Sequence, residues 1–210
     1  MTLFDVSKED LQWVNARVSP WKGAIKRLLD FLLALAGLAI LSPLILLIAA
    51  IVKFSSRGPL IFGQERIGRF GRPFQIYKFR TMVSNALELG GFETSSHDPR
   101  ITPVGGFLRN WSLDELPQLW NILKGEMSFV GPRPTLRYQV EAYTARERRR
   151  LLVMPGLSGL AQVRGRNELS WPEKIEWDLR YIENYSLGAD AKILLESVAL
   201  VLAHKGVYGN

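Results

Sequence analysis

The longest pattern in the chain is an uncharged apolar run at residues 31–52, FLLALAGLAILSPLILLIAAIV. Its length is about that needed to cross the hydrocarbon core of a bilayer. The run has no polar face, which disfavours a helix that lies inside a soluble core. Some thirty residues precede it and no small-residue cleavage site follows it, which disfavours a signal peptide. We therefore expect a helix that contacts the membrane.

A Ser42-Pro43 step falls in the middle of this run. Proline bends or breaks a helix, and the serine hydroxyl can bond a carbonyl that the proline leaves free. Basic residues flank the run on both sides: Lys22, Lys26 and Arg27 before it, Lys53 and Arg57 after it. Basic flanks favour the cytoplasmic side, and only a helix–break–helix hairpin that dips into one leaflet keeps both flanks there. A kinked span and this re-entrant hairpin both stay open from composition.

Shorter periodic segments follow. Apolar and alternating residues at 61–62 and 74–77, with a turn at 68–73 between them, predict a β-hairpin. Helical spacing is present at 104–124, 136–151, 173–185 and 189–204. The segments at 84–103 and 154–172 are polar or glycine-rich and predict loops, the first with some helix, and 1–20 predicts a short helix or an ordered tail. The fold class expected is α+β and mostly helical.

Composition narrows the kinds of partner. The chain has 210 residues, which is enough for one domain with a core and a small accessory element. A net charge of +7, from 27 basic and 20 acidic residues, suits a nucleic acid, an anionic membrane surface or a phosphorylated substrate. The absence of cysteine excludes disulfides and thiol catalysis, and two histidines far apart disfavour a histidine-rich metal site.

Familiar catalytic motifs are absent from the sequence. It contains no G-x-x-x-x-G-K-[ST] loop, no G-x-G-x-x-G fingerprint and no H-E-x-x-H. Nucleotide-triphosphatase, dinucleotide-binding and zinc-protease functions therefore lack their usual support. A nucleic-acid partner would rest on net charge alone, without a recognised module.

Two adjacent carboxylates, Asp114 and Glu115, stand in the stretch SLDELPQLWN at residues 112–121. Ser112 and Glu115 have the spacing of a capping box, in which the serine opens a helix and the glutamate bonds back to it. Pro117 fits better if the helix begins at Asp114, because a missing amide donor costs little in the first turn. Both carboxylates then lie in that turn, where the helix dipole favours their ionised form. An ionised aspartate suits covalent catalysis on phosphorus, so helix capping and catalysis both stay open.

Several basic residues stand in glycine, proline or apolar contexts that would hold the backbone and aim the side chain. They are Lys78, Arg80, Arg100, Arg109, Arg133, Arg164 and Arg166. Arginine suits bidentate recognition of phosphate. A surface salt bridge explains any one of them, but several near a carboxylate pair indicate a phosphate-handling site. The run RERRR at residues 146–150 instead predicts a solvated or membrane-surface face.

Together these residues resemble a known family. The stretch at 98–135, DPRITPVGGFLRNWSLDELPQLWNILKGEMSFVGPRPT, closely resembles the core of the bacterial sugar transferases, the monotopic phosphoglycosyl transferases. The resemblance extends upstream to RLLDFLLALAGLAILSPLILLIA and GPLIFGQERIGRFGRPFQIYKFRTM, and downstream to MPGLSGLAQVRGRN. It covers roughly residues 22–205, and the combination is specific although no single piece is.

The resemblance implies an enzyme that transfers a sugar-1-phosphate from a UDP-sugar to a polyprenyl (undecaprenyl) phosphate, with release of UMP. Such enzymes catalyse the first membrane step in the synthesis of exopolysaccharide and related glycans, with Mg²⁺ and a covalent intermediate on an aspartate. In this sequence Asp114 resembles the nucleophile and Glu115 its partner, and the two are the candidate metal contacts. The expected phosphate or nucleotide contacts are Lys78, Arg80, Arg109 and Arg133. Arg164 and Arg166 are second choices for the same role.

The family also implies an organisation. Residues 22–58 would form a re-entrant membrane helix broken at Ser42-Pro43, after an N-terminal segment at 1–21. Residues 59–210 would form a compact catalytic domain with a short β-hairpin and amphipathic helices at the membrane interface. That domain would lie on the cytoplasmic face of the bacterial inner membrane, in contact with phospholipids.

Two other function classes compete with this one. A non-catalytic membrane-anchored module would explain the charge and the apolar run, but not a carboxylate pair among phosphate-directed arginines. A nucleic-acid binder conflicts with the apolar run, so no nucleic acid is expected as a partner. The apolar C-terminal helix leaves a homodimer open, and nothing in the sequence identifies the sugar.

Overall fold

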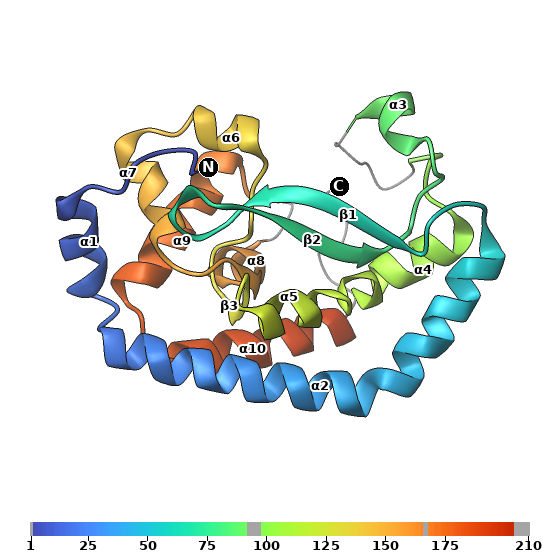
Figure 1. Ribbon diagram of the computed structural model, residues 1–210, viewed down its shortest axis with the longest axis horizontal. Coiled ribbons are helices and arrows are strands. Elements are labelled where there is room, and N and C mark those ends of the chain that lie inside the picture. The colour runs from blue at the N-terminus through green and yellow to red at the C-terminus, as the bar shows by residue number, and fades with distance from the viewer. Residues whose placement is uncertain (1, 92–97, 166–167, 204–210) are drawn as a thin grey trace.

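The computed structural model describes residues 2–91, 98–165 and 168–203 (Figure 1). Its helices are α1 Lys8–Asn15, α2 Pro20–Ser55, α3 Ala86–Gly90, α4 Pro103–Asn110, α5 Gln118–Lys124, α6 Arg137–Glu141, α7 Ala145–Arg148, α8 Leu160–Arg164, α9 Trp171–Glu183 and α10 Leu187–Leu202. Its strands are β1 Ile61–Ile67, β2 Pro73–Phe79, β3 Ser128–Val130 and β4 Gly156–Ser158, and short 3₁₀ turns cover η1 Arg69–Gly71, η2 Leu113–Glu115 and η3 Arg149–Leu152. The predicted α+β, mostly helical class is confirmed.

The longest helix, α2, runs along one side of the molecule and bends within its length (Figure 1). It continues through Pro43 for 36 residues, so the chain stays helical at the Ser42-Pro43 step. Pro43 cannot donate to the carbonyl of Ala39, four residues before it. The hydroxyl of Ser42 donates to that carbonyl at 2.8 Å instead. The carbonyl is thereby satisfied, which explains why the helix bends without breaking.

Most of the apolar surface of α2 faces outward. In the described chain it is the one helix long and apolar enough to cross a membrane, and only 11% of its most apolar window is buried. Ile40 is 76% exposed and Leu46 is 70% exposed. A contiguous apolar surface of this size marks contact with lipid or with another protein. Whether the helix re-enters the leaflet or spans it stays a prediction.

Polar side chains near its start fasten α2 to the rest of the molecule. Arg27 donates to the last carbonyls of α5, at 2.6 Å to Ile122 and 2.7 Å to Leu123. Two residues nearby reach other elements, because Lys26 pairs with Asp190 of α10 at 2.6 Å and Asp30 accepts from the backbone of β3. Buried charges of this kind are tolerated when each has a partner. The membrane-type helix is thus attached to α5, α10 and β3.

The predicted hairpin is confirmed and is longer than expected. β1 and β2 pair antiparallel over seven residues each, with Phe62 opposite Lys78 and Gln64 opposite Ile76. A second, parallel pair, β3 with β4, also forms, and β4 lies in the segment 154–172 that the sequence predicted as a loop. The backbones approach so closely there that a Cβ on Gly156 would lie 2.1 Å from the nitrogen of Gly131. Glycine is required at both sides of this crossing, which holds the segment before Arg133.

The prediction of one continuous charged helix at 136–151 is wrong. The segment is divided into α6, α7 and η3, because Thr144 caps a new helix through the backbone of Glu147. The predicted solvated face at 146–150 is also wrong at its end. Arg150 is 2% exposed and pairs with buried Asp178, and it donates to the carbonyl of Arg133 at 3.0 Å. This arginine therefore stabilises the loop that contains Arg133, one of the predicted site residues.

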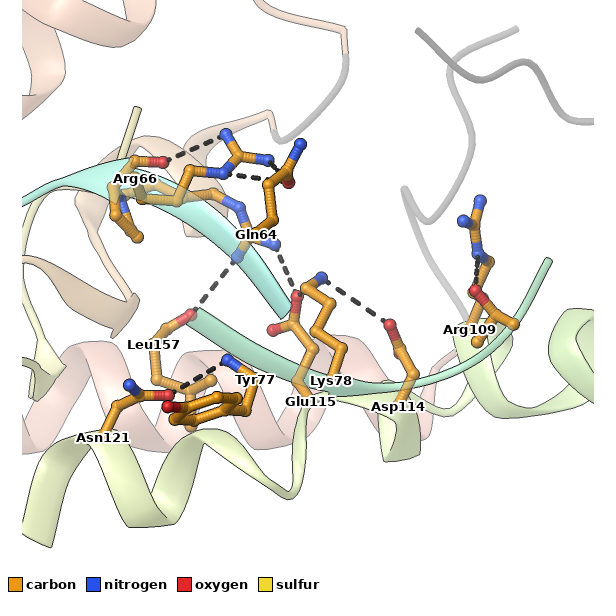
Figure 2. Close-up of polar contacts among 12 residues, drawn as sticks. Gln64, Arg66, Tyr77, Lys78, Arg109, Asp114, Glu115, Asn121 and Leu157 are labelled. Carbon is orange, nitrogen blue, oxygen red and sulfur yellow. Dashed lines mark hydrogen bonds and ion pairs between the residues drawn. The ribbon is translucent and has the colours of Figure 1, made fainter. Parts of the chain in front are cut away.

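One buried amide joins α5 to the hairpin. Asn121 is fully buried, and its oxygen accepts from the backbone nitrogen of Tyr77 at 3.2 Å (Figure 2). Its nitrogen donates to the carbonyl of Gln75 at 2.6 Å. The same nitrogen donates to Glu126 at 2.7 Å. These bonds fix α5 relative to β2, and hence the segment before α5 relative to Lys78.

We expect Asn121→Ala to lower the free energy of unfolding by about 2–4 kcal/mol, because it leaves backbone groups of β2 unpaired inside the protein. Lys124→Ala, on the same helix, removes a surface pair with Glu126 and should cost less than about 1 kcal/mol. Denaturant unfolding in detergent micelles measures both. Equal losses from the two variants would contradict this role for Asn121.

Candidate active site

The carboxylate pair lies in the 3₁₀ turn η2, directly before α5. The predicted capping box is not formed, because Ser112 has a left-handed backbone with φ 54° and its side chain makes no cap bond. α5 begins only at Gln118, since Pro117 at its N-cap has no amide hydrogen. Both carboxylates do lie in a first helical turn, as predicted, but it is the 3₁₀ turn η2 and not the first turn of α5. A left-handed serine is strained, and such strain gathers at functional sites.

Lys78 of β2 stands between the two carboxylates (Figure 2). Its Nζ lies 2.5 Å from Glu115 and 3.6 Å from Asp114. Arg133 approaches Glu115 at the same oxygen that Lys78 contacts. Strand, turn and loop thus bring three predicted site residues around Asp114.

The two carboxylates differ in their electrostatic setting. Burial raises the pKa of Asp114 above its ordinary value, although the charge of Lys78 opposes the shift. Burial also acts on Glu115, but the charges of Arg133 and Lys78 outweigh it and hold the pKa of Glu115 well below its ordinary value. Two neighbouring carboxyl groups whose pKa values shift in opposite directions indicate different roles. Glu115 is thus held as an anion by the two cations, and Asp114 is held less firmly in its ionised form.

The other predicted contacts fall into two groups. Arg109 lies beside the site, where its Nε donates to the hydroxyl of Thr81 at 2.8 Å (Figure 2). Arg80 is buried and is committed elsewhere, because its guanidinium donates to carbonyls of Val52 and Ser56 near the end of α2. Arg80 thus stabilises the end of α2, although it also lines the cavity at Asp114, and its assignment as a phosphate contact stays a prediction.

Two further assignments come from the glycine-rich segment. Arg164 is half-exposed, pairs with Glu196 of α10 at 3.3 Å and lines a separate small pocket, so the structure does not bring it to the carboxylate pair. Arg166 lies outside the described residues. Arg100 is likewise structural, since it bonds Asp98 and the carbonyls of Ala86 and Gly91. An arginine in a fixed backbone context can hold the protein's own carbonyls as well as a phosphate, and the sequence does not separate the two.

A cavity of about 1580 Å³ opens at Asp114 and Glu115. Sequence reasoning missed several of its polar lining residues, namely Gln64, Arg66, Gln139 and Lys174, together with the aromatic Trp171. Burial, followed by the charge of Arg133, lowers the pKa of Arg66 to about 10. The alternation along the hairpin could have found two of them, because Gln64 and Arg66 share the face of β1 that lies opposite Lys78.

The side chains of the site supply only part of the coordination that a magnesium ion needs. In the described parts of the chain no three His, Cys, Asp or Glu residues gather to hold a metal. Asp114 and Glu115 supply two carboxylates, and Mg²⁺ is commonly held by one or two carboxylates plus the phosphate oxygens of a substrate. The pair therefore fits an ion that arrives with a diphosphate.

Comparison with known proteins gives a consistent result. A family model described as bacterial sugar transferase matches residues 21–204. The exopolysaccharide production protein ExoY of Sinorhizobium fredii is 41% identical over 206 residues, which cover 91% of this chain and 91% of that protein.

Two longer relatives have more specific names. The undecaprenyl-phosphate galactose phosphotransferase of Salmonella typhimurium is 39% identical over 199 residues, 88% of this chain and 42% of that protein. The UDP-glucose:undecaprenyl-phosphate glucose-1-phosphate transferase of Klebsiella pneumoniae is 41% identical over 205 residues, 90% of this chain and 43% of that protein.

We expect Lys78→Met to raise the pKa of Asp114 further, because the cation that opposes the effect of burial is removed. The ¹³C shift of the Asp114 carboxyl, followed against pH, measures this. Lys124→Met is the matched control, since Lys124 pairs with Glu126 outside the site. If the Asp114 titration is unchanged in Lys78→Met, the electrostatic role of Lys78 is refuted.

Proposed function

The chain belongs to the bacterial sugar transferase family, and we propose that it transfers a sugar-1-phosphate from a UDP-sugar to a polyprenyl phosphate such as undecaprenyl phosphate. The products are UMP and a polyprenyl-diphosphate sugar. The observation that carries this proposal is a buried aspartate, Asp114, surrounded by Lys78, Glu115 and Arg133 at the edge of a large cavity. The names of the relatives supply the class of donor and acceptor.

The reaction proceeds in two displacements. A carboxylate oxygen of Asp114 attacks the sugar-linked phosphorus of the UDP-sugar, a phosphorus–oxygen bond forms, and the bond to UMP breaks. A phosphate oxygen of the polyprenyl phosphate then attacks the same phosphorus and releases the carboxylate. Each step exchanges one phosphorus–oxygen bond for another, so no net proton transfer is required. Splitting the reaction lets a soluble and a lipid substrate use one nucleophile in turn.

The surrounding side chains explain how a carboxylate could do this. Lys78 lies within reach of both carboxylates, and Arg133 meets Glu115 from the opposite side of the site. Once a diphosphate enters, these cations can transfer their contacts to its oxygens, where charge develops in the transition state. Asp114 must be ionised to attack, so its raised pKa places the acid limb of the rate profile above the ordinary range of an aspartate.

Magnesium fits this site with the substrate bound. Asp114 and Glu115 would hold the ion together with diphosphate oxygens. Bound there, Mg²⁺ would neutralise charge on the diphosphate. The residues of the chain bind and orient the same oxygens through Lys78 and Arg133.

The properties of α2 support a location of the protein at the inner membrane. Its exposed apolar surface and its basic flanks suit a helix that enters the inner membrane and returns to the cytoplasmic side, as in the re-entrant arrangement expected from the sequence. The cavity would then lie near the level of the lipid headgroups. A polyprenyl phosphate presents its phosphate at that level.

We expect Asp114→Asn to reduce UMP release from the preferred UDP-sugar by at least about 10³-fold, because an amide cannot act as the nucleophile. The assay uses purified protein in nanodiscs with undecaprenyl phosphate, Mg²⁺ and a panel of UDP-sugars. Glu65→Gln is the control, since Glu65 is a half-exposed carboxylate on β1 that pairs with Arg137. Full turnover by Asp114→Asn would remove this residue as nucleophile.

A panel that gives no UMP from any UDP-sugar would refute the donor class. In that case a non-catalytic membrane-anchored module, the alternative that shares α2 and the basic charge, would be favoured.

A further inference from the structure

The cavity continues beyond the carboxylates into a region without charged side chains. This part, which we name the apolar lobe, is lined by Leu33, Gly37 and Leu41 of α2 and by Leu194, Val198 and Leu202 of α10. The two sets come from helices at opposite ends of the sequence, which run along the same side of the molecule (Figure 1). The lobe therefore lies between the membrane-type helix and the last helix of the described chain.

The spacing of these residues is that of two continuous helix faces. Leu33, Gly37 and Leu41 follow one another at intervals of four, and on α10 the lining positions are 194, 197, 198, 201 and 202. Each set spans nine residues, which corresponds to about 12 Å of helix. The charged residues Lys192 and Glu196 of α10 line a separate small pocket with Arg164. One face of α10 is thus apolar and open to the cavity, and another is polar.

The apolar lobe has little to offer a polar ligand. Its two hydroxyls, Ser158 and Ser197, contact each other, and Ser197 donates to the carbonyl of Ile193 at 2.7 Å. Nucleotides and sugars need donors and acceptors along their length, and these hydroxyls already use theirs on the protein. Other elements supply the polar residues of the cavity, among them Gln64 and Arg66 of β1, Lys174 of α9 and Gln162 of α8.

The apolar lobe begins directly at the reacting group. Leu119, which also lines it, stands five residues after Asp114 and is the second residue of α5. Arg133 contacts Glu115 and also approaches the carbonyl of Leu157, another lining residue, at 3.5 Å (Figure 2). A molecule with an anionic head at Arg133 and an apolar tail would therefore have its tail directed into the lobe.

We propose that the apolar lobe between α2 and α10 holds the first isoprene units of the acceptor lipid, with its phosphate at Lys78 and Arg133. The rest of the polyprenyl chain leaves between Leu33 and Val198, which are 51% and 58% exposed, into the bilayer beside α2. The cavity of about 1580 Å³ exceeds the roughly 300–1,000 Å³ typical of a site for one small ligand. The polar part is thereby left to the UDP-sugar, so each substrate reaches Asp114 from its own side.

This inference rests on the proposed function, and its test separates the two substrates. Val198→Trp fills the lobe from α10, and Gly37→Leu fills it from α2, where a Cβ would meet Leu119 at an ordinary 3.5 Å. Leucine also has a higher helix propensity than glycine, so the second variant should not weaken α2. Leu195→Trp is the matched control, because Leu195 is 72% exposed and does not line the cavity.

We expect both lobe variants to raise the KM for undecaprenyl phosphate at least tenfold. The exchange of labelled UMP into the UDP-sugar, which needs no acceptor, should stay within twofold of the wild type. Leu195→Trp should change neither quantity. An acceptor KM within twofold of wild type in both variants would overturn the proposal, and so would a parallel loss of UMP exchange, which would assign the lobe to the nucleotide sugar.

Binding of tritiated undecaprenyl phosphate to the protein in nanodiscs gives the same comparison without turnover. We expect at least tenfold weaker binding to Val198→Trp than to the wild type, and unchanged binding would overturn the proposal. If wild-type protein exchanges no UMP with any UDP-sugar, the proposed donor class fails. This binding experiment still decides whether the apolar lobe holds the acceptor lipid. Displacement of the lipid by bilayer phosphatidylglycerol at equal affinity would assign the lobe to ordinary phospholipid.

Discussion

The buried amide of Asn121 is the contact on which the site depends most. It joins α5 to β2 through bonds to Tyr77 and Gln75. Asp114 and Glu115 precede α5, and Lys78 follows Tyr77, so one side chain fixes the lysine relative to the carboxylates. A buried polar group with all its bonds made specifies one arrangement, because any shift leaves a donor or acceptor unpaired. The geometry around Asp114 therefore comes from the scaffold and does not require a bound substrate.

The same scaffold connects the site to the membrane-type helix. Arg27 of α2 holds the carboxyl end of α5, while the carboxylates stand before its amino end. Asp30 holds β3, which leads to Arg133. α2 thus both exposes an apolar surface and supports the carboxylate pair with its cations. This arrangement explains how an enzyme with one soluble and one lipid substrate could keep a single site at the boundary between them.

The sequence predicted the hairpin, the long apolar helix and the final two helices, because each has a strong local period. It misjudged 136–151, where a new cap at Thr144 divides the helix, and the turn at Ser112, where a left-handed residue prevents the cap. Asp114, Glu115, Lys78 and Arg133 do gather as predicted. Arg80 and Arg164 do not join them, since the protein's own carbonyls and Glu196 occupy them. Tertiary contacts decide whether an arginine binds its own chain or a ligand, and no local pattern reveals them.

The central claim is that Asp114 carries the phosphosugar between the two substrates. Mass spectrometry of peptides from protein quenched after mixing with the preferred UDP-sugar and Mg²⁺, without acceptor lipid, tests it most directly. The account expects the mass of one sugar phosphate on the peptide containing Asp114, and its disappearance when undecaprenyl phosphate is added. An adduct on another residue, or full transfer activity with no adduct formed at any quenching time, would contradict the account.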